Sequence, residues 1–146
     1  VDFKCMVDKV VIDHEEKTIQ PYDLKVTWNV ENFTDNYYLY RKTYLQASLY
    51  YIGLIMHFQE LFLDYTILPM KFVVADSLNY MNPLIYKLTK DDLKAGFVGF
   101  YNNGKKHRGL RDIINDLKFH KESNIWNISK DNYDKRGLVN LNIKYE

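Results

Sequence analysis

The chain of 146 residues has one cysteine, almost no net charge and no apolar run long enough to cross a membrane. The single cysteine, Cys5, excludes an internal disulfide framework and favours a reducing compartment. A net charge of +1 excludes the global basic field of a passive DNA coat, but it is compatible with a local basic path. Residues 1–13 contain no uninterrupted apolar stretch of the kind that a signal peptide requires. We therefore expect a soluble, cytoplasmic protein without a membrane partner.

Other catalytic and metal-binding patterns are also missing. The four histidines do not have the spacing of zinc ligands, and one cysteine cannot complete a cysteine-based zinc site. No Gly-x-Ser-x-Gly motif supports serine hydrolase chemistry. Residues 99–106 have the outline of a phosphate-binding loop, but Lys106 stands where that loop needs Ser or Thr, and no clear strand precedes it. We therefore do not expect a nucleoside triphosphate site.

The length and the apolar pattern predict a single α/β domain over residues 1–146. Segments rich in Val and Ile predict strands at residues 3–12, 18–27, 72–75 and 84–88. A charged turn between the first two makes them a hairpin. Helical spacing predicts helices at 37–58 and 110–121, the first capped by Thr34, Asp35 or Asn36, and another helix that starts near Thr89. The tail ends in an alternating segment, 138–143. We expect a central mixed sheet that starts with a hairpin and is flanked by helices.

A carboxylate and a lysine share one face of the second predicted strand. Side chains two apart on a strand point the same way, roughly 6.5–7 Å apart, so Asp23 and Lys25 project from one face and Leu24 and Val26 from the other. Such a pair can serve one reacting phosphate, because the carboxylate can hold a divalent cation while the ammonium positions the attacking water. The acidic-x-Lys pattern occurs five times, and we interpret the other four copies as solvated surface pairs.

Asp8 distinguishes the Asp23 copy from the others. It shares a face of the first predicted strand with apolar residues, where an unpaired charge would cost several kcal/mol without a partner or a metal. A hairpin would place Asp8 and Asp23 on neighbouring strands, where both could reach one cation. The alternative is that Asp8 caps the sheet edge or pairs with Lys9 or Lys25.

The following helix adds two polar groups. Gln46 and Tyr50 are four residues apart and therefore share one helical face. The glutamine could hydrogen-bond the lysine or a substrate phosphate, and the tyrosine could support it. The alternative is a Tyr-rich amphipathic helix with Gln46 at its margin. Trp28 and Trp126 could stack on bases, although we favour core packing for them.

A basic run follows in the second half of the chain. It comprises Lys105, Lys106, Arg108 and Arg111 and predicts a patch that contacts DNA phosphates. The alternative is an ordinary solvated loop.

Three of these segments together resemble the PD-(D/E)XK nuclease superfamily, and in particular its phage and prophage exonucleases of the lambda exonuclease and exodeoxyribonuclease VIII types. The segments are residues 6–13, 23–27 and 44–51. The resemblance implies a restriction-endonuclease-like core. It also implies a Mg²⁺ or Mn²⁺ site formed by Asp8, Asp23 and the Leu24 carbonyl. The catalytic residues that it implies are Lys25, Gln46 and Tyr50.

The function implied by the resemblance is metal-dependent hydrolysis of DNA, as an exonuclease on duplex ends in phage or prophage recombination or repair. It also implies a homo-oligomer and a single-strand annealing protein as partners. An endonuclease and a non-catalytic nucleic-acid-binding or structural domain are the alternatives. The chain has Val7 where the superfamily name has Pro. Family members usually carry an upstream helix with a further ligand, so we expect a fragment or a trimmed member.

Overall fold

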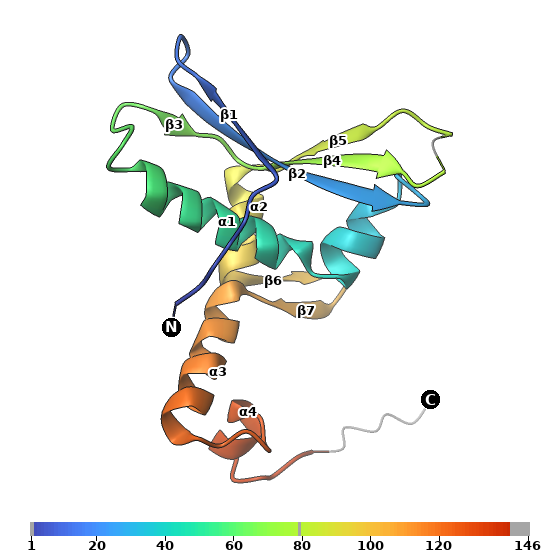
Figure 1. Ribbon diagram of the computed structural model, residues 1–146. Coiled ribbons are helices and arrows are strands. Elements are labelled where there is room, and N and C mark those ends of the chain that lie inside the picture. The colour runs from blue at the N-terminus through green and yellow to red at the C-terminus, as the bar shows by residue number, and fades with distance from the viewer. Residues whose placement is uncertain (1, 79, 141–146) are drawn as a thin grey trace.

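The computed structural model describes residues 2–78 and 80–140, which form a mixed α/β structure (Figure 1). The main sheet has five strands: β1 (Lys9–Asp13), β2 (Thr18–Thr27), β3 (Thr66–Ile67), β4 (Lys71–Asp76) and β5 (Leu84–Lys87). Strands β1 and β5 run antiparallel to their neighbours, whereas β2 pairs in parallel with both β3 and β4. The expected mixed central sheet with flanking helices is confirmed.

The predicted hairpin is the first element. Strands β1 and β2 pair antiparallel, with Ile12 opposite Ile19. The carboxylate of Asp13 accepts the backbone N–H groups of residues 15 and 16 at 3.0 and 2.9 Å, and Lys17 closes the turn at a φ of 51°. The second strand has the predicted bounds, but the first starts at Lys9 instead of residue 3. Asp8 consequently lies just before the strand.

The long helix predicted over residues 37–58 is wrong in its first part. A π-helical segment, η1 (Thr34–Tyr40), is followed by a break, and α1 (Thr43–Phe58) starts after Lys42, which has a left-handed φ of 59°. The expected caps at residues 34–36 therefore lie at the start of η1, and no side chain caps α1. Tertiary packing overrides the local pattern, because the buried Phe33 ring packs against Tyr37, Phe72 and Tyr86 and draws η1 onto the core.

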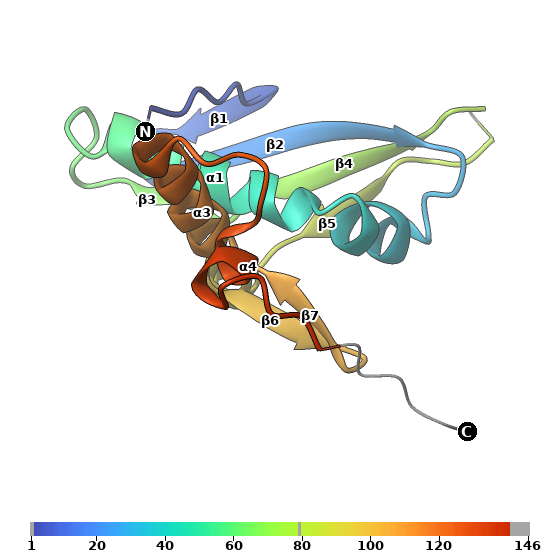
Figure 2. The same cartoon turned by 90° about the horizontal axis from the view of Figure 1, so that it is seen from below.

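Helix α1 lies across one face of the sheet, between parallel strands β2 and β4 in the chain. The described helices all lie on this side (Figures 1 and 2). The core forms between α1, α2 and the inner face of the sheet, and it consists of Val30, Phe33, Ala47, Met70, Phe72, Val74, Leu88 and Leu93. The sheet's other face exposes Leu24, Val26 and Ile85, more than half of each side chain.

Helix α2 (Lys90–Val98) starts where the sequence predicts. Thr89 and Asp92 form a capping box, in which each side chain accepts the other's backbone N–H. Gly96 lies so close to α1 that a Cβ there would be 2.3 Å from Ser48 Oγ and 2.6 Å from the Tyr44 carbonyl oxygen. The absence of a side chain at Gly96 therefore sets the distance between α1 and α2.

The end of the described chain consists of a small hairpin and two helices. Strands β6 (Gly99–Asn102) and β7 (Lys105–Arg108) are joined by Asn103 and Gly104, both at positive φ. Asn-Gly is the preferred dipeptide of this turn, so residues 99–106 are a hairpin instead of a phosphate-binding loop. Helix α3 (Leu110–Ser123) confirms the last predicted helix, and α4 (Lys130–Asp134) follows.

Two further expectations concern membrane-spanning helices and the segment 138–143. No helix among residues 2–78 and 80–140 is long and apolar enough to cross a membrane. The alternating segment 138–143 lies mostly outside the described residues, and its first part, 138–140, is not a strand.

Candidate active site

The second half of β2, from Asp23 to Thr27, turns its polar residues towards α1 and its apolar residues to the outside. Asp23 is only 2% exposed and Lys25 is half-buried, whereas Leu24 and Val26 are each 55% exposed. The predicted sharing of faces is thus confirmed. The carboxylate and the lysine lie in the layer between the sheet and α1, where the electrostatic environment is less polar than water.

Asp8 is exposed, so the expectation of a charge held on a buried apolar face is wrong. Its Oδ2 accepts the backbone N–H of Leu24 at 2.8 Å. The β1–β2 ladder ends where Lys9 pairs with Tyr22, and the Asp8 side chain takes the next donor along β2. Asp8 therefore caps the edge of the sheet at the residue that follows Asp23, and its charge is one of the causes that raise the pKa of Asp23.

Asp23 is the buried centre of the cluster. The Lys25 ammonium lies 2.5 Å from its Oδ2 as an ion pair, and among the described residues this oxygen has no other polar partner. Burial raises the pKa of Asp23, Lys25 opposes this, and the charge of Asp8 adds to it. A buried carboxylate needs such a partner, because an uncompensated charge in this layer would be costly.

Helix α1 supplies the remaining contacts. The Gln46 side-chain amide donates to Asp23 Oδ1 at 3.1 Å and to the Tyr50 hydroxyl oxygen at 3.0 Å. The spacing of four residues places both groups on the helix face that covers β2. The Gln46 amide thus binds the carboxylate of Asp23. The sequence had suggested Lys25 or a substrate phosphate as the partner of Gln46. The structure brings Asp23, Lys25, Gln46 and Tyr50 together as one cluster, and Asp8 lies at its edge on the backbone N–H of Leu24.

The donor set of this cluster fits a hard divalent cation. In an extended strand the N–H and C=O of one residue point to the same side, so the Leu24 carbonyl lies on the side of Asp8. Among the described residues, no three His, Cys, Asp or Glu side chains converge as a metal site. Mg²⁺ needs fewer protein ligands, because it commonly retains several waters and takes one or two carboxylates. Two carboxylates and a carbonyl fit Mg²⁺ or Mn²⁺.

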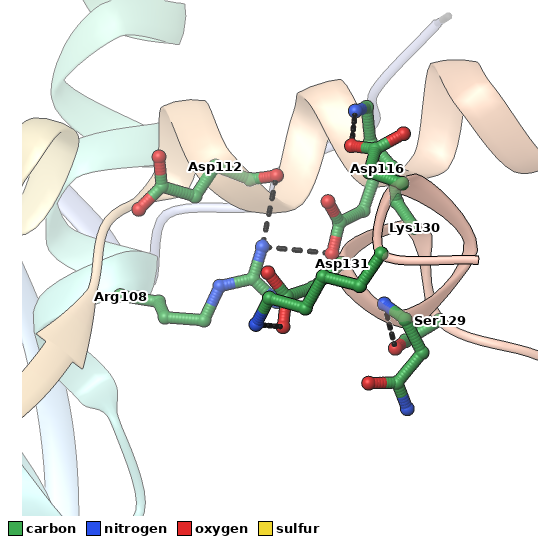
Figure 3. A network of polar contacts seen from close by, with 9 residues as sticks. Arg108, Asp112, Asp116, Ser129, Lys130 and Asp131 are labelled. Carbon is green, nitrogen blue, oxygen red and sulfur yellow. Dashed lines mark hydrogen bonds and ion pairs between the residues drawn. The ribbon is translucent and has the colours of Figure 1, made fainter. Parts of the chain in front are cut away.

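The predicted basic patch is divided by the structure. Lys105 and Lys106 are exposed on β7. Arg108 instead turns towards α3, where it forms an ion pair with Asp116 at 2.7 Å and donates to the Asp112 carbonyl oxygen (Figure 3). Arg111 lies in the first turn of α3, exposed. The two lysines are available to an anionic partner, whereas Arg108 is already engaged.

The expectation that Trp28 and Trp126 pack in the core is wrong. Trp28 is 72% exposed and Trp126 is 61% exposed, with its ring stacked on His120. The Tyr-rich helix does follow the core interpretation at Tyr44, whose ring is buried against Phe100.

Comparison of the chain with models of protein families, with curated proteins and with solved structures gave no match.

Proposed function

We propose that the chain is a divalent-metal-dependent DNA nuclease with a restriction-endonuclease-like core. The observation that carries the proposal is the buried carboxylate of Asp23 paired with the ammonium of Lys25, on the face of β2 that α1 covers. A carboxylate and a lysine in this relation provide a ligand for a metal and a cation for a phosphate, and both promote phosphodiester hydrolysis.

Asp8, Asp23 and the Leu24 carbonyl would hold Mg²⁺ or Mn²⁺. When bound, the ion supplies Lewis-acid polarisation of a phosphoryl oxygen. Lys25 provides a positive charge that can orient the attacking water and offset the charge that develops on the phosphate. Gln46 fixes the rotamer of Asp23 through Oδ1, and Tyr50 fixes Gln46 in turn.

The resemblance to phage and prophage exonucleases favours action on the ends of duplex DNA, during recombination or repair. It also supports a homo-oligomer and a single-strand annealing protein as partners.

The test is cleavage of linear and closed circular duplex DNA with Mg²⁺ or Mn²⁺. Lys25→Ala should lower the rate by about 10²–10³-fold, the usual effect of removing one group that stabilises the transition state. Lys87→Ala is the matched control, because Lys87 is exposed on β5, at a position paired with the outer-face residue Lys71. Cleavage of linear DNA alone would identify an exonuclease, and cutting of closed circles an endonuclease.

The proposal fails if neither this chain nor a version extended at its N-terminus cuts DNA with either metal. A folded protein that still binds DNA under those conditions would be a non-catalytic nucleic-acid-binding domain.

A further inference from the structure

A basic groove lies where η1, the first turn of α1 and the β6–β7 hairpin meet. Its volume is about 680 Å³. Two segments far apart in the sequence supply its basic residues: Lys42 before α1, and Lys105, Lys106 and Arg108 on β7. Asp35 is its one carboxylate among the described lining residues. Four cations against one carboxylate make the groove positive, although the net charge of the whole chain is only +1.

Three of these cations are available to a ligand. Lys42, Lys105 and Lys106 are exposed, and none forms an ion pair with the part of the chain that the structure describes. Arg108 differs, because its guanidinium is held by Asp116. The free positive charge of the groove therefore comes from the three lysines. Lys42 lies on one side of the groove, and Lys105 and Lys106 lie on the other.

The two sides of the groove are fixed to one another. The Tyr44 hydroxyl, from the first turn of α1, donates to the Arg108 carbonyl oxygen at 3.1 Å. The Tyr44 ring also packs edge-on against Phe100 and His107 of the hairpin. Lys42 on one side and Lys105 and Lys106 on the other are therefore carried by elements in direct contact. Such preorganisation lowers the entropic cost of binding.

The groove and the candidate active site share helix α1 but no lining residue. Lys42 precedes Gln46 by four residues, which is about one helical turn or 6 Å along the axis. Gln46 contacts Asp23 from the next turn of the same helix, whereas Lys42 and Tyr44 line the groove.

We propose that this groove binds the sugar–phosphate backbone of the DNA substrate, and that Lys42, Lys105 and Lys106 make the contacts. The inference rests on the proposed nuclease function. Lysines that contact phosphates neutralise charge without reading bases, so the binding is independent of sequence and weakens steeply with salt.

The experiment measures binding by fluorescence anisotropy with a labelled DNA duplex in EDTA, where no cleavage occurs, over a series of salt concentrations. Each of Lys42→Gln, Lys105→Gln and Lys106→Gln should weaken binding and lower the slope of log K against log salt by about 0.9. The triple variant should lower the slope by about 2.7, because three contacts are lost. Asp35→Asn should tighten binding, and Lys87→Gln, on β5, should leave it unchanged.

The groove and the nuclease function can fail separately. A wild-type protein that binds DNA while the triple variant keeps the wild-type affinity and slope would overturn the groove, whether or not the protein cuts DNA. A wild-type protein that does not bind at low salt would also overturn it. Loss of binding in the triple variant of a protein that never cuts DNA would support the groove and leave the nuclease proposal refuted. Thermal melting of each variant shows that the fold is retained.

Discussion

Replacing Asp23 by asparagine should stabilise the metal-free protein. Burial raises the pKa of Asp23 above its ordinary value of 3.8, so the folded state disfavours the ionised form that predominates in the unfolded chain at pH 7. The wild type therefore loses stability as the pH rises through the folded-state pKa of Asp23. Asp23→Asn should lack this dependence, because the introduced amide does not ionise. The amide of the introduced asparagine can donate to Gln46 Oε1 once the side-chain amide of Gln46 rotates by half a turn.

The size of the effect follows from two opposing contributions. Removing the buried charge of Asp23 relieves a desolvation penalty, which is about 1–3 kcal/mol for a buried polar group. Removing the negative partner of Lys25 opposes this gain, but the pKa of Asp23 is raised on balance, so burial outweighs the attraction between the two groups and the net stays at the low end of that range. The net gain should be about 1 kcal/mol, which for a chain of this size corresponds to about 2–4 °C in Tm.

Adding metal should reverse the order of stability. A ligand present at 100 times its Kd stabilises the folded state by about 2.7 kcal/mol, or about 5–11 °C in Tm here. The wild type should gain this with Mg²⁺ or Mn²⁺, and Asp23→Asn should gain little. The assay is thermal unfolding followed by circular dichroism, at several pH values, in EDTA and with each metal.

Asp64→Asn is the control with the opposite sign. The ion pair with Lys17 lowers the pKa of Asp64, so its ionised form contributes to stability above the ordinary pKa, and this contribution is lost as the pH falls. This variant should not be stabilised at pH 7, and it should keep the wild-type response to metal. The reasoning is refuted if Asp23→Asn melts below the wild type in EDTA, or if both respond equally to metal.

Three further substitutions separate positioning from packing. Tyr50→Phe removes the acceptor of the second Gln46 N–H. We expect cleavage to slow by about 5–10-fold, equivalent to about 1 kcal/mol, with little change in Tm. A wild-type cleavage rate would contradict this. Tyr86→Phe loses hydrogen bonds to two loop carbonyls and should lower Tm by about 2–4 °C while cleavage persists. Gly96→Ala should destabilise the protein by about 1–3 kcal/mol in denaturant unfolding, because the new Cβ would meet Ser48 Oγ; an unchanged midpoint would show that α2 can move.

The sequence predicted those parts of the fold that depend on local signals. Strand β2 has the predicted bounds because a charged turn precedes it and β-branched residues stand at both of its ends. Helix α2 starts at Thr89 because the capping box is a contact between residues three apart. The shared face of Asp23 and Lys25 follows from the period of a strand alone.

The parts that the sequence did not predict depend on contacts between distant residues. The Tyr-rich pattern continues through residues 37–58, so nothing local marks the break at Lys42, which the packing of Phe33 imposes. Residues 3–7 alternate like a strand but lie against α1, where Cys5 approaches Gly53. The pairing of Arg108 with Asp116 is likewise a tertiary contact. The hairpin at Asn103-Gly104 was also not predicted, but for a different reason. That dipeptide is a strong local hairpin signal, so the sequence alone could have indicated the turn.

The orientation of β2 has a consequence for how the sheet finds its register. Because side chains alternate, a slip of one residue would turn Tyr22, Leu24 and Val26 towards α1 and expel Asp23 and Lys25. From Asp23 to Thr27 the slipped strand would bury more apolar surface than the native one, whereas it would expose Ile19 and Pro21, which the native strand buries. In this second half of β2, directional polar contacts therefore help to select the native register, and the Asp13 turn and the Asp8–Leu24 hydrogen bond are two of them. The side chains of the candidate site thus frustrate the folding of the strand that carries them.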